Sequence, residues 1–177
     1  MSLASEMNQL FAGADRVATH GRSFHENLEI LVEQTGSGRA AGRLLGVPET
    51  TIRRWRTGVT PRRVLDLVPF ARVAASARKG AFGKVYRGEA TIAIKAVIVY
   101  SSDRRERWIH IGREISRQKM QGIMRAWAGG DDERATRLMR NAIYRDYFHI
   151  EPPRAGEVDE DDQPAVTLGA ITDMRIE

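Results

Sequence analysis

The segment from Gly38 to Gly58, GRAAGRLLGVPETTIRRWRTG, places the strongest constraint on how this chain folds. Its spacing is that of a helix-turn-helix, in which a second short helix crosses the first. The crossing needs a small residue, which Gly42 supplies, and the turn needs a residue that tolerates a positive φ, which Gly46 supplies. The spacing predicts helices over about Gly38–Leu45 and Pro48–Thr57, with an apolar plug of Leu45, Val47, Ile52 and Trp55.

The second of these helices is expected to read DNA. Opposite Ile52 and Trp55 it presents five polar side chains, namely Glu49, Thr50, Arg53, Arg54 and Thr57. Such a helix enters the major groove, where arginine is the best reader of guanine. We therefore predict that Arg53 and Arg54 contact bases. Phosphate contacts are expected from five further residues, Arg39, Arg43, Arg56, Arg62 and Arg63. The alternative is an ordinary helical hairpin with a solvated basic face.

The distribution of charge favours a polyanionic partner, with double-stranded DNA as the expected one. Residues 35–79 contain ten basic and two acidic side chains, a net charge of +8, whereas residues 151–177 carry −6. Of the 28 basic residues 24 are arginine, which suits bidentate phosphate and guanine contacts, although a GC-rich genome gives the same ratio.

The composition also excludes several classes of protein. The chain has no cysteine and no apolar run of the ~18 residues that predict a membrane span. A disulfide scaffold, a cysteine-based zinc finger and an integral membrane protein are therefore excluded. We expect a cytoplasmic, nucleoid-associated protein with no membrane partner.

The chain as a whole predicts an α+β fold in two domains. Residues 1–78 are expected to form an all-helical helix-turn-helix domain, with further helices over Ser23–Gln34 and Val64–Ala77. Residues 79–177 are expected to form a small α+β dimerisation or partner domain with an acidic C-terminal segment. Its elements are a β-hairpin within Lys84–Tyr100, a strand at Trp108–Ile111, helices at Ser116–Ala128 and Asp131–Phe148, a mobile acidic stretch at Glu151–Gln163, and a closing strand at Ala165–Ile176.

No pattern in the chain predicts catalysis, a cofactor or a metal site. The run GAFGKVYRGEATIAIK, ending at Lys95, is similar to the glycine-rich loop and strand lysine of protein kinases. Arg78 stands where the first glycine belongs, and neither a His-Arg-Asp nor an Asp-Phe-Gly motif follows, so a β-hairpin with a glycine turn is expected instead. The four histidines lack metal-ligand spacing. We expect a binding protein that is not an enzyme.

The second half also has the strand–helix–helix order of ribbon-helix-helix proteins, DNA binders whose strands pair between two chains. In that arrangement Arg107, Ile109 and Ile111 share one face of the strand, and Trp108 and His110 share the other. The two isoleucines make a poor basic reading face, so a dimerisation or nucleation role is expected for this half. We therefore expect the protein to form a homodimer or a higher homo-oligomer.

The order of parts resembles the telomere terminal proteins of linear actinobacterial chromosomes and plasmids. Their helix-turn-helix has the form A-x-x-L-G-V-x-x-x-T-[VI]-x-R-[WY], which here falls on Ala41, Leu44 or Leu45, Gly46, Val47, Thr51, Ile52, Arg54 and Trp55. A β-rich stretch, a strand, two helices and the final AVTLGAITDMRIE follow in the family's order. The resemblance implies a protein that binds and caps the ends of a linear replicon. It also implies priming of end synthesis through a side-chain hydroxyl, with a replication protein as partner.

For the priming step the resemblance points to the hydroxyls of Ser101 and Ser102, with Tyr100 behind them. The family uses a threonine as the primer hydroxyl, and this stretch offers serines. Two other functions are compatible with a helix-turn-helix. One is a transcriptional repressor of a phage or plasmid, whose second half dimerises or senses a ligand. The other is a phage terminase small subunit, which forms rings.

Overall fold

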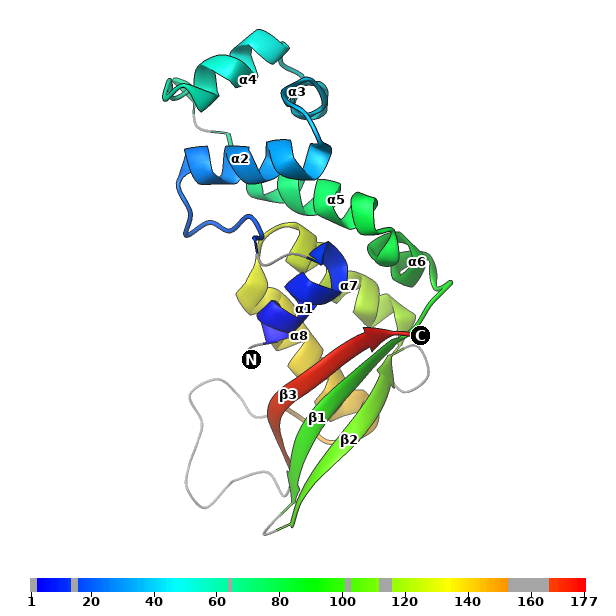
Figure 1. Cartoon of the computed structure of the whole chain (residues 1–177). Coiled ribbons are helices and arrows are strands. Elements are labelled where there is room, and N and C mark those ends of the chain that lie inside the picture. The colour runs from blue at the N-terminus through cyan, green and yellow to red at the C-terminus, as the bar shows by residue number, and fades with distance from the viewer. Residues whose placement is uncertain (1–2, 14–15, 64, 101–102, 112–115, 153–165) are drawn as a thin grey trace.

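The expected α+β architecture is confirmed by a computed structural model that describes residues 3–13, 16–63, 65–100, 103–111, 116–152 and 166–177 (Figure 1). Within these ranges the chain forms eight α-helices, one short π-helix and a three-stranded sheet. The molecule is elongated. Helices α2 (Phe24–Thr35), α3 (Gly38–Leu45) and α4 (Glu49–Arg56) form one end, and the sheet with the helices that cover it forms the other.

The first helix of the helical end is delimited by its capping residues. α2 (Phe24–Thr35) begins after Ser23, whose hydroxyl accepts a hydrogen bond from the Glu26 N–H. The Glu26 carboxylate accepts one from the Ser23 N–H in return, which completes a capping box. The helix ends at Gly36, which has a left-handed φ of +82°. The predicted helix at this position is confirmed.

The next three helices differ little from the sequence prediction. α3 (Gly38–Leu45) and α4 (Glu49–Arg56) match it to within one residue at each end. α5 (Val68–Lys79) begins four residues later than predicted, and Pro69 lies in its first turn. Proline is well suited to this position, where its missing N–H would have no partner within the helix.

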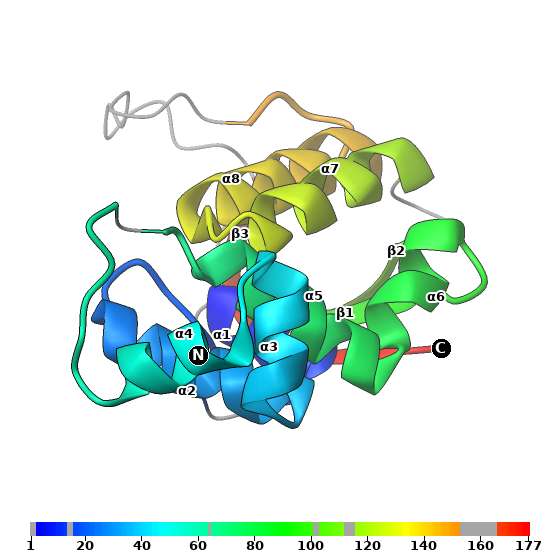
Figure 2. The ribbon, with the colours of Figure 1, turned by 90° about the horizontal axis from the view of Figure 1, so that it is seen from above.

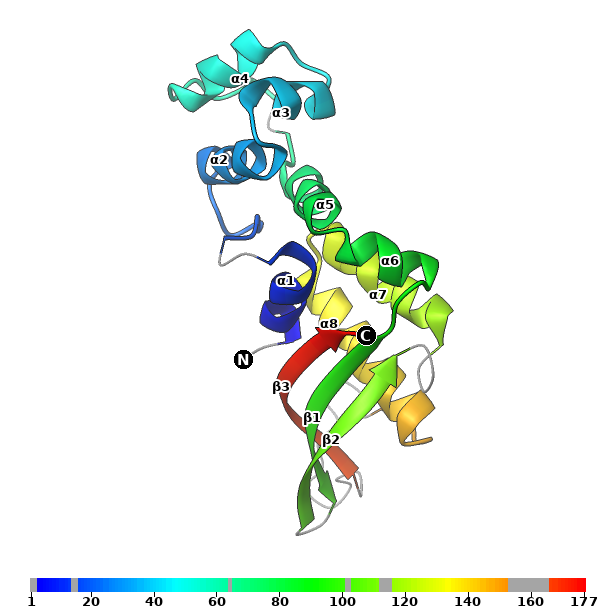
Figure 3. The ribbon, with the colours of Figure 1, turned by 45° about the vertical axis from the view of Figure 1, so that its right-hand side comes forward.

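The sheet has three antiparallel strands in the order β2-β1-β3. β1 (Ile92–Tyr100) is central and pairs with β2 (Asp103–Ile111) on one side and with β3 (Val166–Ile176) on the other. The pairing with β3 shifts register on both sides of Ala96. The predicted strands near β2 and β3 are confirmed, although β2 begins five residues earlier than expected. Figure 3 shows the hairpin end of the sheet extending past the helices.

Helices pack on the sheet to form its core. α7 (Arg117–Ala128) and α8 (Asp132–Ala142) form a helical layer (Figure 2), and the π-helix η1 (Ile143–Tyr147) continues α8. Three alternate residues of β1 are fully buried in this core, namely Ile92, Ile94 and Ala96. The core also receives α1 (Leu3–Ala12), a helix that the sequence pattern did not predict.

Residues 81–87 correct the sequence prediction, because they form a helix and not part of a β-hairpin. In α6 (Ala81–Arg87), Phe82 and Val85 are three residues apart and pack on the same core. This helical spacing is satisfied by burial, whereas a strand would turn the two side chains to opposite faces. The hairpin is made instead by β1 and β2. The kinase-like Lys95 lies on β1, where its ammonium group pairs with Glu106 at 2.7 Å.

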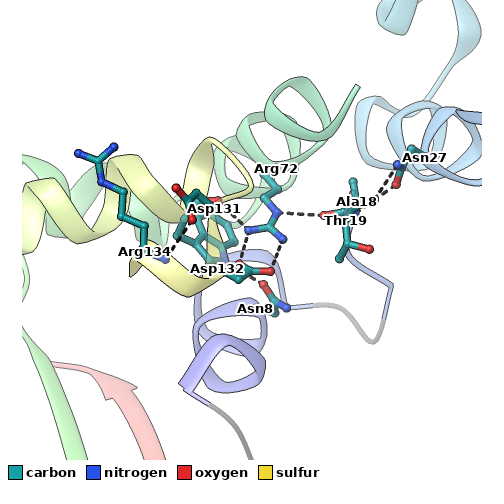
Figure 4. Close-up of polar contacts among 9 residues, drawn as sticks. Asn8, Ala18, Thr19, Asn27, Arg72, Asp131, Asp132 and Arg134 are labelled. Atoms are coloured by element: carbon teal, nitrogen blue, oxygen red, sulfur yellow. Dashed lines mark hydrogen bonds and ion pairs between the residues drawn. The ribbon is translucent and has the colours of Figure 1, made fainter. Parts of the chain in front are cut away.

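A buried arginine joins the two ends of the molecule. Arg72 of α5 is 0% exposed and donates hydrogen bonds to the carbonyl oxygens of Ala18 at 3.0 Å and Trp127 at 2.7 Å (Figure 4). Its guanidinium also donates to both carboxylate oxygens of Asp132, at 2.7 and 2.9 Å. Because Asp132 is the first residue of α8, this ion pair fixes α5 against the α7–α8 layer.

Two hydrophobic clusters accompany the two ends. One lies among α2 to α5 around Leu28, Ile52 and Trp55, and the other joins α1, α6, α7, α8 and the sheet. The domain boundary expected after residue 78 falls inside α5, and α1 belongs to the second cluster. The division into domains 1–78 and 79–177 stays a prediction. Most of the acidic stretch expected to be mobile lies in residues 153–165, outside the described ranges.

Candidate nucleic-acid interface

The turn between α3 and α4 has the geometry that its spacing predicts. The Val47 N–H donates a hydrogen bond to the Gly42 carbonyl at 2.9 Å, which brings the start of α4 onto α3. A Cβ atom at Gly42 would lie 2.7 Å from the Val47 carbonyl oxygen, so a larger residue requires a backbone shift. Gly46 has a φ of +70°, in the left-handed region that favours glycine. Both glycines therefore have the roles expected of them.

The inner side of α4 is anchored in the apolar cluster of the helical end. Ile52 and Trp55 are 1% and 7% exposed. Phe24 of α2 meets the Trp55 ring edge to face, with 5.6 Å between the ring centroids. Leu45 and Val47 are partly buried against the same cluster, as predicted. This packing fixes the rotation of α4 about its axis and thereby determines which of its side chains face solvent.

Arg56, the last residue of α4, is held within the chain. Its guanidinium donates to both carboxylate oxygens of Glu29 on α2, at 2.7 and 2.9 Å. These hydrogen bonds lower the pKa of Glu29 below its usual value of 4.5 and raise the pKa of Arg56. Arg56 was expected to contact phosphate, and its clamp between α4 and α2 was not predicted. The two residues are 27 positions apart, so no local pattern reveals the pair.

The outer side of α4 is polar and open to solvent. All five side chains expected there are exposed, namely Glu49, Thr50, Arg53, Arg54 and Thr57. The Thr57 hydroxyl donates to the Arg54 carbonyl at 2.8 Å, at the C-terminal end of the helix. Among the described residues, neither the Arg53 nor the Arg54 guanidinium has a hydrogen-bond or ion-pair partner. Two cations on an anchored helix are thus available to a ligand.

Four further arginines lie near α4. Arg39 and Arg43 are on α3, Arg62 and Arg63 are in the segment between α4 and α5, and all four are exposed. In the part of the chain that the structure describes, none of the four forms an ion pair. Figure 1 shows α3 and α4 at the end of the molecule that is furthest from the sheet. The candidate base-reading and phosphate-binding side chains thus gather at one end.

The second half offers a different arrangement from a ribbon-helix-helix protein. β2 pairs with β1 of its own chain, whereas ribbon-helix-helix strands pair between two chains. The predicted alternation along β2 is confirmed: Ile109 is buried in the core, and on the opposite face the Arg175 guanidinium lies 4.2 Å from the centroid of the Trp108 ring. The candidate priming hydroxyls of Ser101 and Ser102 lie outside the described residues.

Within the described ranges, there is no group of three or more histidine, aspartate or glutamate side chains that could hold a metal ion. No helix in these ranges is long and apolar enough to cross a lipid bilayer. Comparison with protein-family models, curated proteins and solved structures finds no match. The function is therefore inferred from the geometry of α3 and α4.

Proposed function

We propose that this protein binds double-stranded DNA through α3 and α4, with α4 in the major groove. The observation that carries the proposal is the division of α4 into two sides. Ile52 and Trp55 anchor one side in the apolar cluster, while Arg53 and Arg54 stand in solvent with no partner among the described residues. An anchored helix offers its donors at fixed positions, and an arginine can donate to guanine O6 and N7 together. Arg53 and Arg54 are the proposed base readers.

Phosphate contacts supply the sequence-independent part of the affinity. Arg39, Arg43, Arg62 and Arg63 are the proposed phosphate ligands, because they are exposed around α4 and form no ion pair within the described residues. Each neutralised phosphate releases counterions, so binding of this kind weakens as salt rises. Arg56 contributes mainly by holding α4 on α2 through Glu29.

The biological role that we propose is capping of the ends of a linear replicon, as the resemblance to telomere terminal proteins implies. In this role the protein acts as a homodimer or higher homo-oligomer, works with a replication protein and is not itself an enzyme. The geometry of α3 and α4 supports the DNA-binding step, whereas the choice of replicon ends rests on the resemblance.

The DNA-binding step is tested by selecting duplexes from a random library with the purified protein and two variants. One variant is Arg53→Ala/Arg54→Ala. The control is Arg16→Ala/Arg87→Ala, which removes the same charge from two exposed arginines that already have carboxylate partners. We expect the wild type and the control to enrich one site. The Arg53→Ala/Arg54→Ala variant should lose about 1–3 kcal/mol for each arginine, which is roughly 5- to 150-fold in affinity for each of the two. Equal enrichment of the site by all three proteins would show that α4 does not read it.

The position of the enriched site then tests the role. Sites at replicon ends, with protein that stays on the DNA after boiling in detergent, support a terminal protein. A palindrome near a promoter, with half-sites about 34 Å apart, contradicts that role and indicates a repressor. Rings with a mass many times 19.9 kDa indicate a packaging subunit.

A further inference from the structure

Helix α8 carries a row of three arginines that take no part in the DNA contacts proposed for α3 and α4. Arg134, Arg137 and Arg140 are all exposed, and no guanidinium of the three has a hydrogen-bond or ion-pair partner among the described residues. Two other basic residues of this region are paired. Lys119 pairs with Asp146, and Arg145 pairs with Glu151 at 2.9 Å. The row is therefore a concentration of uncompensated positive charge on a surface far along the chain from α4.

The three arginines lie on one side of α8. A spacing of three residues places them within an arc of about 120° and over about 9 Å of helix length. The opposite side holds Ala135 and Met139, which are buried in the core of the sheet end. Like charges three residues apart repel one another and disfavour the helix. A helix that keeps such a row without partners thus offers donors to a ligand with several negative charges.

The acidic residues of α8 do not neutralise this row. They gather at its N-terminal end, where negative charge is favourable to the helix dipole. Asp131 caps the helix by accepting the Arg134 backbone N–H at 3.0 Å, and Asp132 is bound by Arg72. Glu133 lies four residues before Arg137, yet the structure forms no ion pair between them.

We propose that Arg134, Arg137 and Arg140 bind the phosphodiester backbone of DNA, as a second contact that is independent of base sequence. The ligand class rests on the proposed function of α3 and α4. Guanidinium groups suit phosphate oxygens, because they are weakly hydrated and present parallel donors. Along each strand of a duplex there is one charge per ~3.4 Å of axis, so the ~9 Å row spans about two to three phosphates of one strand.

The Arg72 junction gives this second contact a fixed relation to the first. Arg72 of α5 binds Asp132, the first residue of α8, so the arginine row is held relative to the helices that carry α4. Figure 4 shows the Arg134 side chain directed away from this junction. The row therefore contacts DNA outside the site that α4 reads, either on flanking duplex or on a second duplex.

The test compares Arg134→Gln/Arg137→Gln/Arg140→Gln with Arg16→Gln/Arg87→Gln/Arg105→Gln. The second variant is a matched control, because it removes the same charge from three exposed arginines that have carboxylate partners. Binding to a duplex of roughly 40 base pairs without the selected site is measured over a series of salt concentrations. The slope of log affinity against log salt should fall by about 0.9 per lost contact, or about 2.7 for the α8 variant, and stay unchanged for the control.

The outcomes separate this inference from the proposed function. Equal slopes for the α8 variant, the control and the wild type overturn the α8 contact, whatever α4 does. A reduced slope for the α8 variant supports it, provided that Arg134→Lys/Arg137→Lys/Arg140→Lys restores most of the slope and all proteins melt alike. If Arg53→Ala/Arg54→Ala discriminates sites as well as the wild type does, base reading by α4 fails, and the slope of the α8 variant still decides the α8 contact by itself.

Discussion

Replacing Arg72 by methionine is expected to destabilise the protein strongly, because the guanidinium links four groups at the junction of the two ends. The side chain is 0% exposed and makes hydrogen bonds of 2.7–3.0 Å to two carbonyl oxygens and to the Asp132 carboxylate. It also lies 5.4 Å from the centroid of the Trp127 ring. Methionine preserves much of the apolar stem but satisfies none of these acceptors.

The expected loss can be worked from these contacts. Breaking a buried ion pair by removing one partner costs about 3–5 kcal/mol. The Asp132 side chain is 31% exposed, so water relieves part of its stranded charge and favours the lower part of that range. The carbonyls of Ala18 and Trp127 each lose a partner, which adds to the cost. We expect a decrease of about 4 kcal/mol in the free energy of unfolding, a large share of the ~5–15 kcal/mol typical of a domain.

Urea unfolding followed by circular dichroism measures this loss. Arg16→Met serves as the control, because Arg16 is 56% exposed and lies 3.7 Å from Glu33, a geometry that contributes less than about 1 kcal/mol. Asp132→Asn completes a double-mutant cycle, in which Arg72 and Asp132 should couple favourably. A loss below about 1 kcal/mol for Arg72→Met, equal to that of the control, would refute the assignment of Arg72 as the joint between the two ends.

Two further predictions concern the end of the molecule that α2, α3 and α4 form. Gly42→Ala should destabilise by about 1–3 kcal/mol through the clash with the Val47 carbonyl. The control is Gly122→Ala in α7, where an added Cβ atom meets no atom within 4 Å; this variant should stabilise the protein by about 0.5–1 kcal/mol. Melting temperatures that shift in the same direction for the two variants would contradict this prediction. Because Arg56 lowers the pKa of Glu29, their pair stabilises above about pH 4.5 and is lost as pH falls. The urea concentration at the unfolding midpoint should therefore fall less steeply with decreasing pH in Glu29→Gln than in the wild type. An equal fall in the two proteins would contradict a stabilising role of the pair.

The helix-turn-helix could be predicted almost to the residue because its determinants are local. Gly36 and Gly46 have the positive φ values that end α2 and α3, and Gly42 has the close approach that the motif requires. The exposed face of α4 follows from helical periodicity once Ile52 and Trp55 are placed inside. These features depend on neighbours in sequence and so are visible in it.

The elements that were mispredicted depend on distant contacts. α1 is short, and helices of this length are marginal without packing; it is stabilised where Met7, Leu10 and Phe11 meet the core formed by later residues. α6 carries glycine and valine, which weaken a helical prediction, and its Phe82 ring packs 5.4 Å from that of Phe11. Neither contact leaves a signal within a local window.

The ion pairs could not be predicted from the sequence for the same reason. Arg56 meets Glu29 across 27 positions, and Arg72 meets Asp132 across 60. A chain with 24 arginines offers many such pairs on paper. Only the fold separates arginines that brace the structure, such as Arg72, from those left available to a ligand, such as Arg53 and Arg137.

The central position of β1 has a consequence for how the chain reaches this fold. β1 can pair with β2 as soon as both have been synthesised, because they are neighbours in sequence. Its other edge is completed by β3, which begins 66 residues after β1 ends, at Val166. Until then the nascent sheet presents an open backbone edge of the kind that pairs with other chains. The cluster among α2 to α5 contains no residue of β3, so on the ribosome these helices can fold while the sheet still depends on a strand yet to be made.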